Sequence, residues 1–445
     1  MLSINNNSML NIKNNRLFIK INTFLICLLP LALITGPAIP DFIVILVSIF
    51  FLFYFINKGF KIITDKKLFI FFIFFYFFLI FSSLFSDYTL TSLRFSMPYI
   101  RFIFLSFCIG YLIQNNHKKF YYYFFFSCLL ALLILLVDST FQFFNNKNIL
   151  GFVTPVTGRI SSVFNDEMIL GSYILKISPI FFTTIFYLNI SFKKKKFLFF
   201  ATYVSCFIVI IISGDRAPLF LFTLFSILLF ILFKKFRFHF LVIIFLIIFF
   251  LLTLLSIHKP IFNRIVTQTI NEIGLGEKNY SSEKFNRDDK DLEFYKKNNF
   301  FFSAVHENYF ITSLNIFKDN YFIGGGPKSF FHLSQSKKYS LDKFSASNHP
   351  HNFYFQLLAE TGIIGFSFVL FFFFYLIKIF FRVVTAKINY DNNINFFIAG
   401  IPLAGLIFHL WPFITTGSFF TNYNCILLYM CLGFFLGKRE YIKLN

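Results

Sequence analysis

The sequence has little charge, and most of the charge it has is of one sign. Only 14% of its 445 residues are charged, and 20 acidic residues stand against 41 Lys and Arg. Hydrophobic residues make up 57% of the chain and 79 residues are Phe, an apolar content far above that of soluble globular proteins. This composition excludes a water-soluble enzyme. The many apolar runs of about 20 residues predict a chain that crosses a membrane repeatedly.

Cysteine is also scarce and unpatterned. The six cysteines all lie inside apolar runs and form no CxxC pair, which excludes a disulfide framework and a zinc site of the usual spacing. No small-x-small cleavage site follows the first apolar run, so we expect that run to be a retained helix. The cysteines are Cys27, Cys108, Cys128, Cys206, Cys425 and Cys431.

Apolar runs bounded by charged or turn residues predict an all-α polytopic membrane protein with about 12 transmembrane helices. The short segments that alternate between these runs are strongly asymmetric, with 22 Lys and Arg on the side of the N-terminus and four on the other side. By the positive-inside rule, both termini are cytoplasmic, and the net charge of +21 reflects topology rather than nucleic-acid binding. The predicted helices are 17–36, 39–57, 68–85, 97–114, 120–138, 167–190, 197–213, 217–233, 238–257, 351–377, 394–412 and 419–437.

One polar segment is too long to be a simple connection. Residues 258–350 separate helices 1–9, in residues 1–257, from helices 10–12, in residues 351–445, and helix parity places the segment outside the cytoplasm. Loops of this length are commonly functional. We expect its charged part, 277–299, to be mobile, and 307–319 to form a helix along the membrane surface through Phe310, Leu314 and Phe317. A second external loop covers about 139–166.

Two external arginines are candidates for binding phosphate. Arg216 lies in the turn Ser213-Gly214-Asp215-Arg216 between two helices, and Arg159 lies in the loop 139–166. A guanidinium is a fork-shaped donor for phosphate oxygens, but Arg216 could equally anchor the helix end or pair with Asp215. Two further cations, Arg101 and Lys176, fall within predicted helices and need partners, for which Asp138, Asp166 and Glu167 are candidates.

A histidine group precedes the tenth predicted helix, as His349-Pro350-His351-Asn352. Helical spacing places His351 on the same face as Gly362 and Gly365, where small residues allow a neighbouring helix to approach closely. An imidazole at the external end of that helix could accept a proton, or it could simply cap the helix. A metal site formed by His349, His351 and His306 is a further alternative, but histidines two residues apart without a third ligand at fixed spacing favour no metal.

These motifs together resemble a known family. The stretch His351-Asn352, nine residues and Gly362-x-x-Gly365 resembles the signature of bacterial O-antigen ligases and the related O-antigen polymerases. Three further segments, within about residues 157–370, resemble other motifs of that family: Lys318–Phe330, Ser213–Ala217, and Thr157–Asn165 with Leu170–Tyr173. The chain departs from the family pattern at Tyr321 in place of Pro, at Asp215 in place of Ser, and at Asp166-Glu167 in place of Pro-Asn.

The resemblance implies an enzyme of the bacterial inner membrane with a periplasmic active site. Such enzymes transfer a glycan from undecaprenyl diphosphate to an acceptor glycolipid, either lipid A-core in a ligase or a second lipid-linked glycan in a polymerase, without a cofactor or metal ion. It implies that His351 is the catalytic base and that Arg216 and Arg159 bind the diphosphate. His349, Asn352, Gly362, Gly365, Gly324 and Gly326 would support the site.

Two alternatives belong to other classes of protein. A lipid-linked oligosaccharide transporter would carry charged or broken helices near the membrane midplane, often in repeated halves, and the sequence contains no such repeat. In a scaffold without catalytic activity, His351 and Arg216 would be interfacial anchors.

Overall fold

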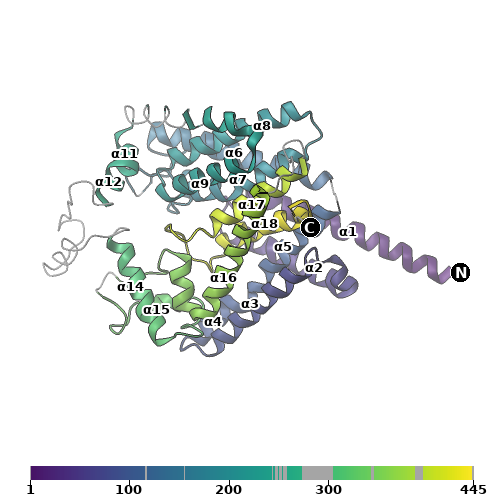
Figure 1. Cartoon of the computed structure of the whole chain (residues 1–445), viewed down its shortest axis with the longest axis horizontal. Coiled ribbons are helices and arrows are strands. Elements are labelled where there is room, and N and C mark those ends of the chain that lie inside the picture. The colour runs from purple at the N-terminus through teal and green to yellow at the C-terminus, as the bar shows by residue number, and fades with distance from the viewer. Residues whose placement is uncertain are drawn as a thin grey trace.

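The computed structural model describes residues 2–115, 118–154, 156–242, 244–245, 249, 253, 258–272, 304–341, 345–385 and 394–442. Within these ranges the chain is helical and contains no strand, which confirms the all-α prediction (Figure 1). The long helices are α1 (Leu2–Ala32), α2 (Ala38–Lys58), α3 (Lys66–Leu84), α5 (Ile100–Gln114), α6 (Lys118–Asn145), α7 (Leu170–Tyr187), α8 (Phe192–Ile212), α9 (Arg216–Leu232), α14 (Ala304–Asp319), α16 (Phe353–Thr385), α17 (Ile394–His409) and α18 (Asn422–Lys438). The short ones are α4 (Thr89–Ser96), α11 (Lys259–Phe262), α12 (Gln268–Glu272) and α15 (Phe330–Leu333).

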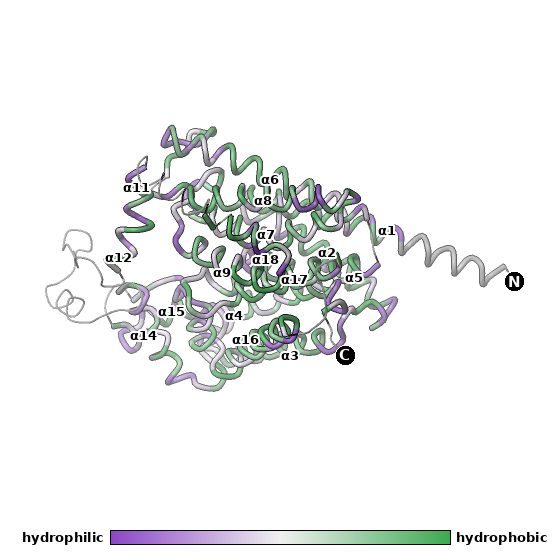
Figure 2. The backbone as a smooth tube through the Cα atoms, turned by 45° about the horizontal axis from the view of Figure 1, so that its top comes forward, coloured by the Kyte–Doolittle hydropathy of each residue, from purple (hydrophilic) through white to green (hydrophobic). Residues whose placement is uncertain are grey.

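Seven helical segments in the described residues are long and apolar enough to cross a membrane, and α9 and α17 are shorter apolar helices. Figure 2 shows the hydrophobic residues along the middle of the bundle, with hydrophilic stretches near α11, α12 and α14 and again toward the opposite end. A membrane protein is therefore supported, while the total of 12 spans remains a prediction. The predicted ninth helix, 238–257, lies largely outside the described residues.

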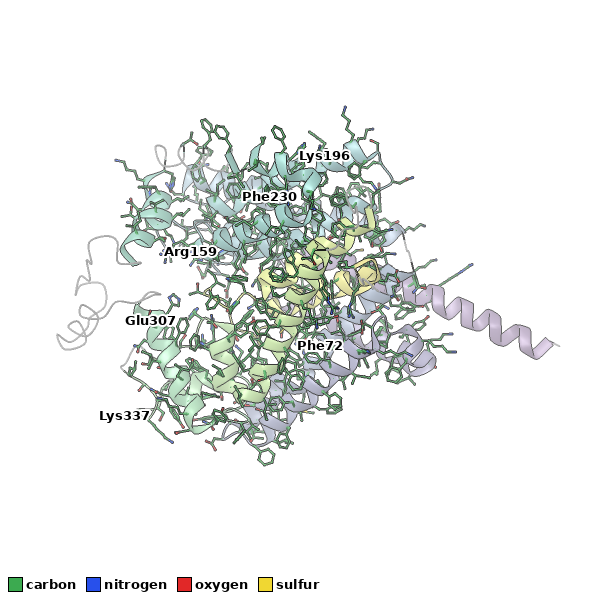
Figure 3. All side chains as sticks on the ribbon, viewed as in Figure 1. Phe72, Arg159, Lys196, Phe230, Glu307 and Lys337 are labelled. Carbon is green, nitrogen blue, oxygen red and sulfur yellow. The ribbon has the colours of Figure 1, made fainter. Side chains whose placement is uncertain are left out.

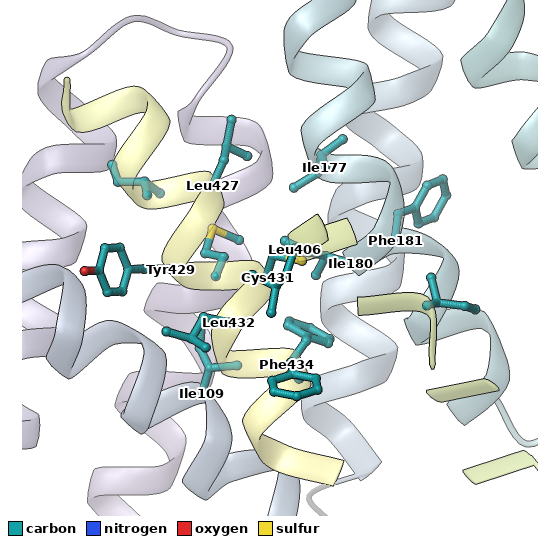
Figure 4. Close-up of a cluster of buried hydrophobic side chains, with 14 of the residues drawn as sticks. Ile109, Ile177, Ile180, Phe181, Leu406, Leu427, Tyr429, Cys431, Leu432 and Phe434 are labelled. Atoms are coloured by element: carbon teal, nitrogen blue, oxygen red, sulfur yellow. The ribbon is translucent and has the colours of Figure 1, made fainter. Parts of the chain in front are cut away.

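Helix α18 forms the centre of the bundle. It packs against α5 on one side and against α7 and α17 on the other, and Leu406, Leu427 and Cys431 lie in this contact (Figure 4). The approach to α5 is close, because a Cβ atom added to Gly433 would stand 2.7 Å from Cβ of Ile109. Small residues at helix contacts allow this spacing in membrane proteins.

The described parts of the loop 258–350 contain α14 and the short helices α11, α12 and α15, and they lie at one end of the molecule (Figure 1). The helix predicted over 307–319 is present as α14, and its position along the membrane surface stays a prediction. Phe310 stacks on Phe355 of α16 with ring centroids 4.3 Å apart, whereas Leu314 is exposed. Helix α14 therefore packs against α16 through Phe310, one of the three apolar residues that the sequence placed on one face of this helix. The charged part, 277–299, lies outside the described residues.

Helix α16 is broken at Gly362, whose φ of 61° and ψ of −167° are not helical. The segment Tyr321–Gly326 fills the break. The N–H groups of Gly325 and Gly326 donate to the carbonyl groups of Ala359 and Glu360, at 2.9 and 2.8 Å. Across the break, the N–H of Ile363 donates to the Tyr321 carbonyl at 2.8 Å. The break thus exposes backbone groups that a distant loop satisfies.

This break corrects the helical-face prediction. Helix α16 begins at Phe353, so His351 lies before it, with a left-handed φ of 57°. His351 and Gly362 therefore do not share a helix face. Gly365 is helical, and a Cβ added to it would stand 2.9 Å from the Phe78 ring of α3, so the predicted close helix approach holds at that glycine alone.

The long loop and the basic run near Lys196 lie toward different ends of the molecule. Arg159 and Glu307 lie toward the end that contains α11, α12 and α14, while Lys196 lies toward the other end (Figure 3). Both chain termini also lie away from α11, α12 and α14 (Figure 1). This arrangement agrees with the predicted separation of the long loop from the basic segments.

Candidate active site

A cavity of about 980 Å³ opens among α7, α9, α14, α18 and the segments that precede α15 and α16. Its wall is strongly basic, because five Lys and Arg side chains line it against two acidic ones. The bases are Arg159, Lys176, Arg216, Arg264 and Lys328, and the acids are Glu167 and Asp215. The cavity therefore favours an anionic ligand.

Arg159 is held by a buried ion pair. Its guanidinium pairs with Asp215, whose side chain is 7% exposed, and donates to the Met168 carbonyl at 2.9 Å. The same two loops also join through the N–H of Ile160, which donates to the Ser213 carbonyl at 3.1 Å. Burial raises the pKa of Asp215, and the charge of Arg159 acts against that rise. The carboxyl group of Asp215 thus pairs with Arg159, a partner that the sequence interpretation did not consider.

Arg216 is the first residue of α9 and is half-buried in the cavity wall. Its Nη1 atom lies 3.5 Å from the hydroxyl oxygen of Thr269 in α12. Arg264, in the π-helical segment Asn263–Thr267 between α11 and α12, lines the same wall. Both guanidiniums therefore stand on the side of the cavity that carries the Arg159–Asp215 pair.

His351 sits among three aromatic rings. Its ring centroid lies 4.1 Å from that of His349, 5.4 Å from that of His306 and 5.5 Å from that of Tyr309, on which it stacks. Burial lowers the pKa of all three imidazoles, that of His349 to about 3 and that of His306 to about 4. Each ring is therefore neutral at pH 7. A neutral imidazole is the form that can accept a proton.

Backbone contacts fix His351 from the other side. Its carbonyl accepts from the N–H of Thr416 at 2.7 Å. Asn352 caps α16 by accepting from the N–H of Tyr354 at 2.9 Å, and its amide donates to the Pro412 and Ile414 carbonyls at 2.7 and 3.0 Å. The left-handed backbone of His351 is thus held by the segment between α17 and α18.

Residues 201–371 match the O-antigen ligase family. The match supports membership of the O-antigen ligase-like superfamily, as the sequence motifs predict, and with it an enzyme of the membrane glycosyltransferase type, ligase or polymerase. The match agrees with the membrane character of the apolar helices. The matched residues include Arg216, Arg264 and His351 but not Arg159. No curated protein matches the chain significantly.

The structure separates the residues that the O-antigen ligase motifs suggested into two groups. His351, His349, Arg216 and Arg159 line the cavity. The others lie behind its wall: Asn352 caps α16, and Gly324, Gly326 and Gly362 join the 321–326 loop to the break in α16, while Gly365 packs against α3. The glycines at 324 and 326 therefore support the fold of the 321–326 loop and do not line the cavity.

Among the cavity residues, His306 was named from the sequence only as a possible metal ligand, and Arg264 and Lys328 were not singled out. His306 and Arg264 lie in the long loop, and Lys328 lies within a segment that resembles the ligase motifs. Their positions relative to His351 depend on how the loop 258–350 folds back onto the helices. The spacing of residues along the sequence does not predict that fold. The signal that was available for Lys328 is its place directly after the Gly324–Pro327 turn.

The predicted partners of the two intrahelical cations are wrong. Arg101 forms an ion pair with Asp41 at 2.8 Å and donates to the Asn422 side chain at 2.9 Å, and Lys176 donates to that of Asn424 at 2.5 Å. Asp138 instead accepts from the hydroxyl of Ser162 at 2.5 Å. Among the described residues, no group of three His, Cys, Asp or Glu side chains is placed to hold a metal ion.

Proposed function

We propose that the chain is an O-antigen ligase-type enzyme that transfers a glycan from undecaprenyl diphosphate to a sugar hydroxyl of a lipid A-core acceptor. The reaction takes place at the periplasmic face of the bacterial inner membrane. The observation that carries this proposal is the single cavity in which His351 faces a wall of arginines. The family match supports the same class of chemistry.

The arginine wall binds the diphosphate of the donor. Arg216 supplies the fork of N–H donors that suits phosphate oxygens, and Arg159 and Arg264 add positive charge beside it. Negative charge develops on the diphosphate as its bond to the anomeric carbon breaks. Fixed guanidiniums stabilise that charge without a metal ion.

His351 is the general base. Its neutral ring takes the proton of the acceptor hydroxyl while the hydroxyl oxygen bonds to the anomeric carbon and undecaprenyl diphosphate leaves. One displacement of this kind inverts the anomeric centre. Burial keeps the pKa of His351 below 6.5, so the base is unprotonated at neutral pH. Asn352 and Thr416 keep the ring facing the cavity.

A deletion strain tests the activity. Surface lipopolysaccharide is resolved on a gel, and the undecaprenyl-linked glycans are measured in parallel. Core-only lipopolysaccharide with long polymer on the lipid carrier supports the ligase. Core with a single repeat unit identifies the polymerase instead, in which the acceptor is a second lipid-linked glycan. An unchanged pattern of both pools contradicts either activity.

Arg216→Lys tests how the diphosphate is bound. The substitution keeps the positive charge and removes the planar fork, so the donor KM is expected to rise and transfer to fall about tenfold. The exposed Lys337→Arg is the matched control for an exchange of these two residue types. Wild-type transfer by Arg216→Lys would contradict bidentate recognition.

A further inference from the structure

The cations that line the cavity with His351 come from two separate parts of the fold. Arg216 and Arg264 come from α9 and from the π-helical segment between α11 and α12, whereas Lys328 directly precedes α15, near α4. In Figure 1, α9, α11 and α12 lie in the upper part of the view, and α4 and α15 lie in the lower part. The segment that carries His351 lines the same cavity.

The surroundings of the histidines show the same division. The charge of Arg216 helps to lower the pKa of His306, and the charge of Lys328 helps to lower that of His349, in each case after burial. Both of these rings flank the ring of His351. Lys328 is thus a cation on the His349 side, separate from the cations on the His306 side.

Lys328 is held in place by an unusual local structure. Its own φ is 65°, a left-handed value that is costly for a residue with a side chain. The buried carboxylate of Glu360 accepts from the N–H of Phe330 at 3.2 Å, and Gln356 donates to the same carboxylate at 2.9 Å. The turn that carries Lys328 is therefore fixed to α16 on a rigid base.

The ammonium group of Lys328 faces the cavity without a bonded partner. The structure describes no hydrogen bond or ion pair for its Nζ atom, which lies 5.6 Å from the centroid of the Phe95 ring. The side chain is half-buried, and burial lowers its pKa, while the charge of the Glu360 carboxylate acts against that fall. A partly buried cation in such a position favours an anionic ligand group.

We propose that Lys328 binds an anionic substituent, phosphate or carboxylate, on the acceptor, close to the hydroxyl that reacts. This inference rests on the proposed function. The arginine wall holds the diphosphate of the donor, and the base removes a proton from the acceptor, so the acceptor occupies the side of His351 away from that wall. Lys328 is a cation on that side, and it makes acceptor choice depend on charge.

The test uses the purified full-length protein in lipid nanodiscs with an undecaprenyl-diphosphate-linked glycan as donor. Lipid A-core from the deletion strain is the acceptor in three forms: untreated, treated with phosphatase, and reduced at its carboxyl groups. For Lys328→Gln we expect the KM for the untreated acceptor to rise about tenfold at an unchanged donor KM. Lys328→Arg restores most of the loss. The exposed Lys337→Gln is the matched control.

The modified acceptors identify the anion and keep the test independent of folding. For wild-type protein, the KM is expected to rise by the same tenfold on the acceptor form that lacks the recognised group. That form is the phosphatase-treated one if the group is phosphate, and the reduced one if the group is carboxylate. Lys328→Gln is expected to have the same KM for that form as for the untreated acceptor. The proposal is overturned if wild-type protein uses all three forms equally, or if Lys328→Gln changes the donor KM. Absence of transfer by wild-type protein to every form would instead refute the proposed function.

Discussion

At the residue scale, the environment of His351 determines how activity depends on pH. The base works only when unprotonated, and burial lowers its pKa from 6.5. The acidic limb of kcat/KM therefore lies below pH 6.5, and activity is lost as the pH falls through that limb. A pH series of transfer by the purified enzyme measures it. A limb above pH 6.5 would contradict a buried neutral base.

Removal of the imidazole tests the same assignment directly. His351→Ala is expected to lower kcat by about 10² to 10⁴, because a positioned base contributes that much to proton transfer. His332→Ala is the control, since His332 lies outside the cavity and stacks on Tyr88. Near-normal transfer by His351→Ala would exclude it as the base.

Arg159 and Arg216 are expected to differ when each is replaced by Ala. Loss of Arg159 leaves the buried Asp215 carboxylate without its ion-pair partner, so the free energy of unfolding falls by about 2 to 3 kcal/mol. Arg216→Ala is expected to raise the donor KM, because it removes the fork of N–H donors that binds the diphosphate. Thermal unfolding in detergent and the donor KM are measured for both variants. An unchanged Tm for Arg159→Ala would contradict the stabilising role of its ion pair with Asp215.

The residue scale is also where prediction from sequence was weakest. The side chains at 159, 216, 349 and 351 were found, because short motifs mark them. The pairing of Arg159 with Asp215 was not, although Asp215 departs from the family pattern at that position. A pairing between loops 56 residues apart depends on the packing of whole helices, and local spacing does not report it.

At the scale of elements, the break in α16 has a measurable role. Gly362→Ala places a Cβ atom 2.5 Å from the backbone of Phe322, and it also strains a backbone with φ of 61°. Gly59 has the same φ and open space around it, so Gly59→Ala reports strain alone. We expect a loss of about 1 kcal/mol at Gly59 and about 3 kcal/mol or more at Gly362, measured by thermal unfolding. Equal losses would mean that loop docking contributes no stability.

The elements themselves were largely predictable, because an apolar run of membrane-spanning length is a strong signal. Helices such as α2, α3 and α8 fall where the apolar runs predict them. The break at Gly362 was not predictable, because a helical reading of His351 to Gly365 ignores the loop 321–326. That loop supplies the hydrogen bonds that make a broken helix stable.

At the scale of the whole molecule, the separation of its two ends predicts which residues face the periplasm. All six native cysteines are buried, so a single exposed cysteine can be labelled over a low background. Lys337, in the long loop, and Lys194, in the basic run that includes Lys196, are both exposed. When intact spheroplasts are treated with an impermeant maleimide, we expect Lys337→Cys to be labelled and Lys194→Cys to remain unlabelled.

The reason lies in how the charges are distributed along the chain. Lys and Arg remain in the cytoplasm during insertion, and the run Lys193–Lys196 follows α7 at the end opposite to Arg159 (Figure 3). Permeabilised membranes provide the control, in which both variants must react. Labelling of Lys194→Cys in intact spheroplasts would mean that the topology is the reverse of the predicted one. The arginine cavity would then face the cytoplasm, where a periplasmic transfer reaction cannot occur.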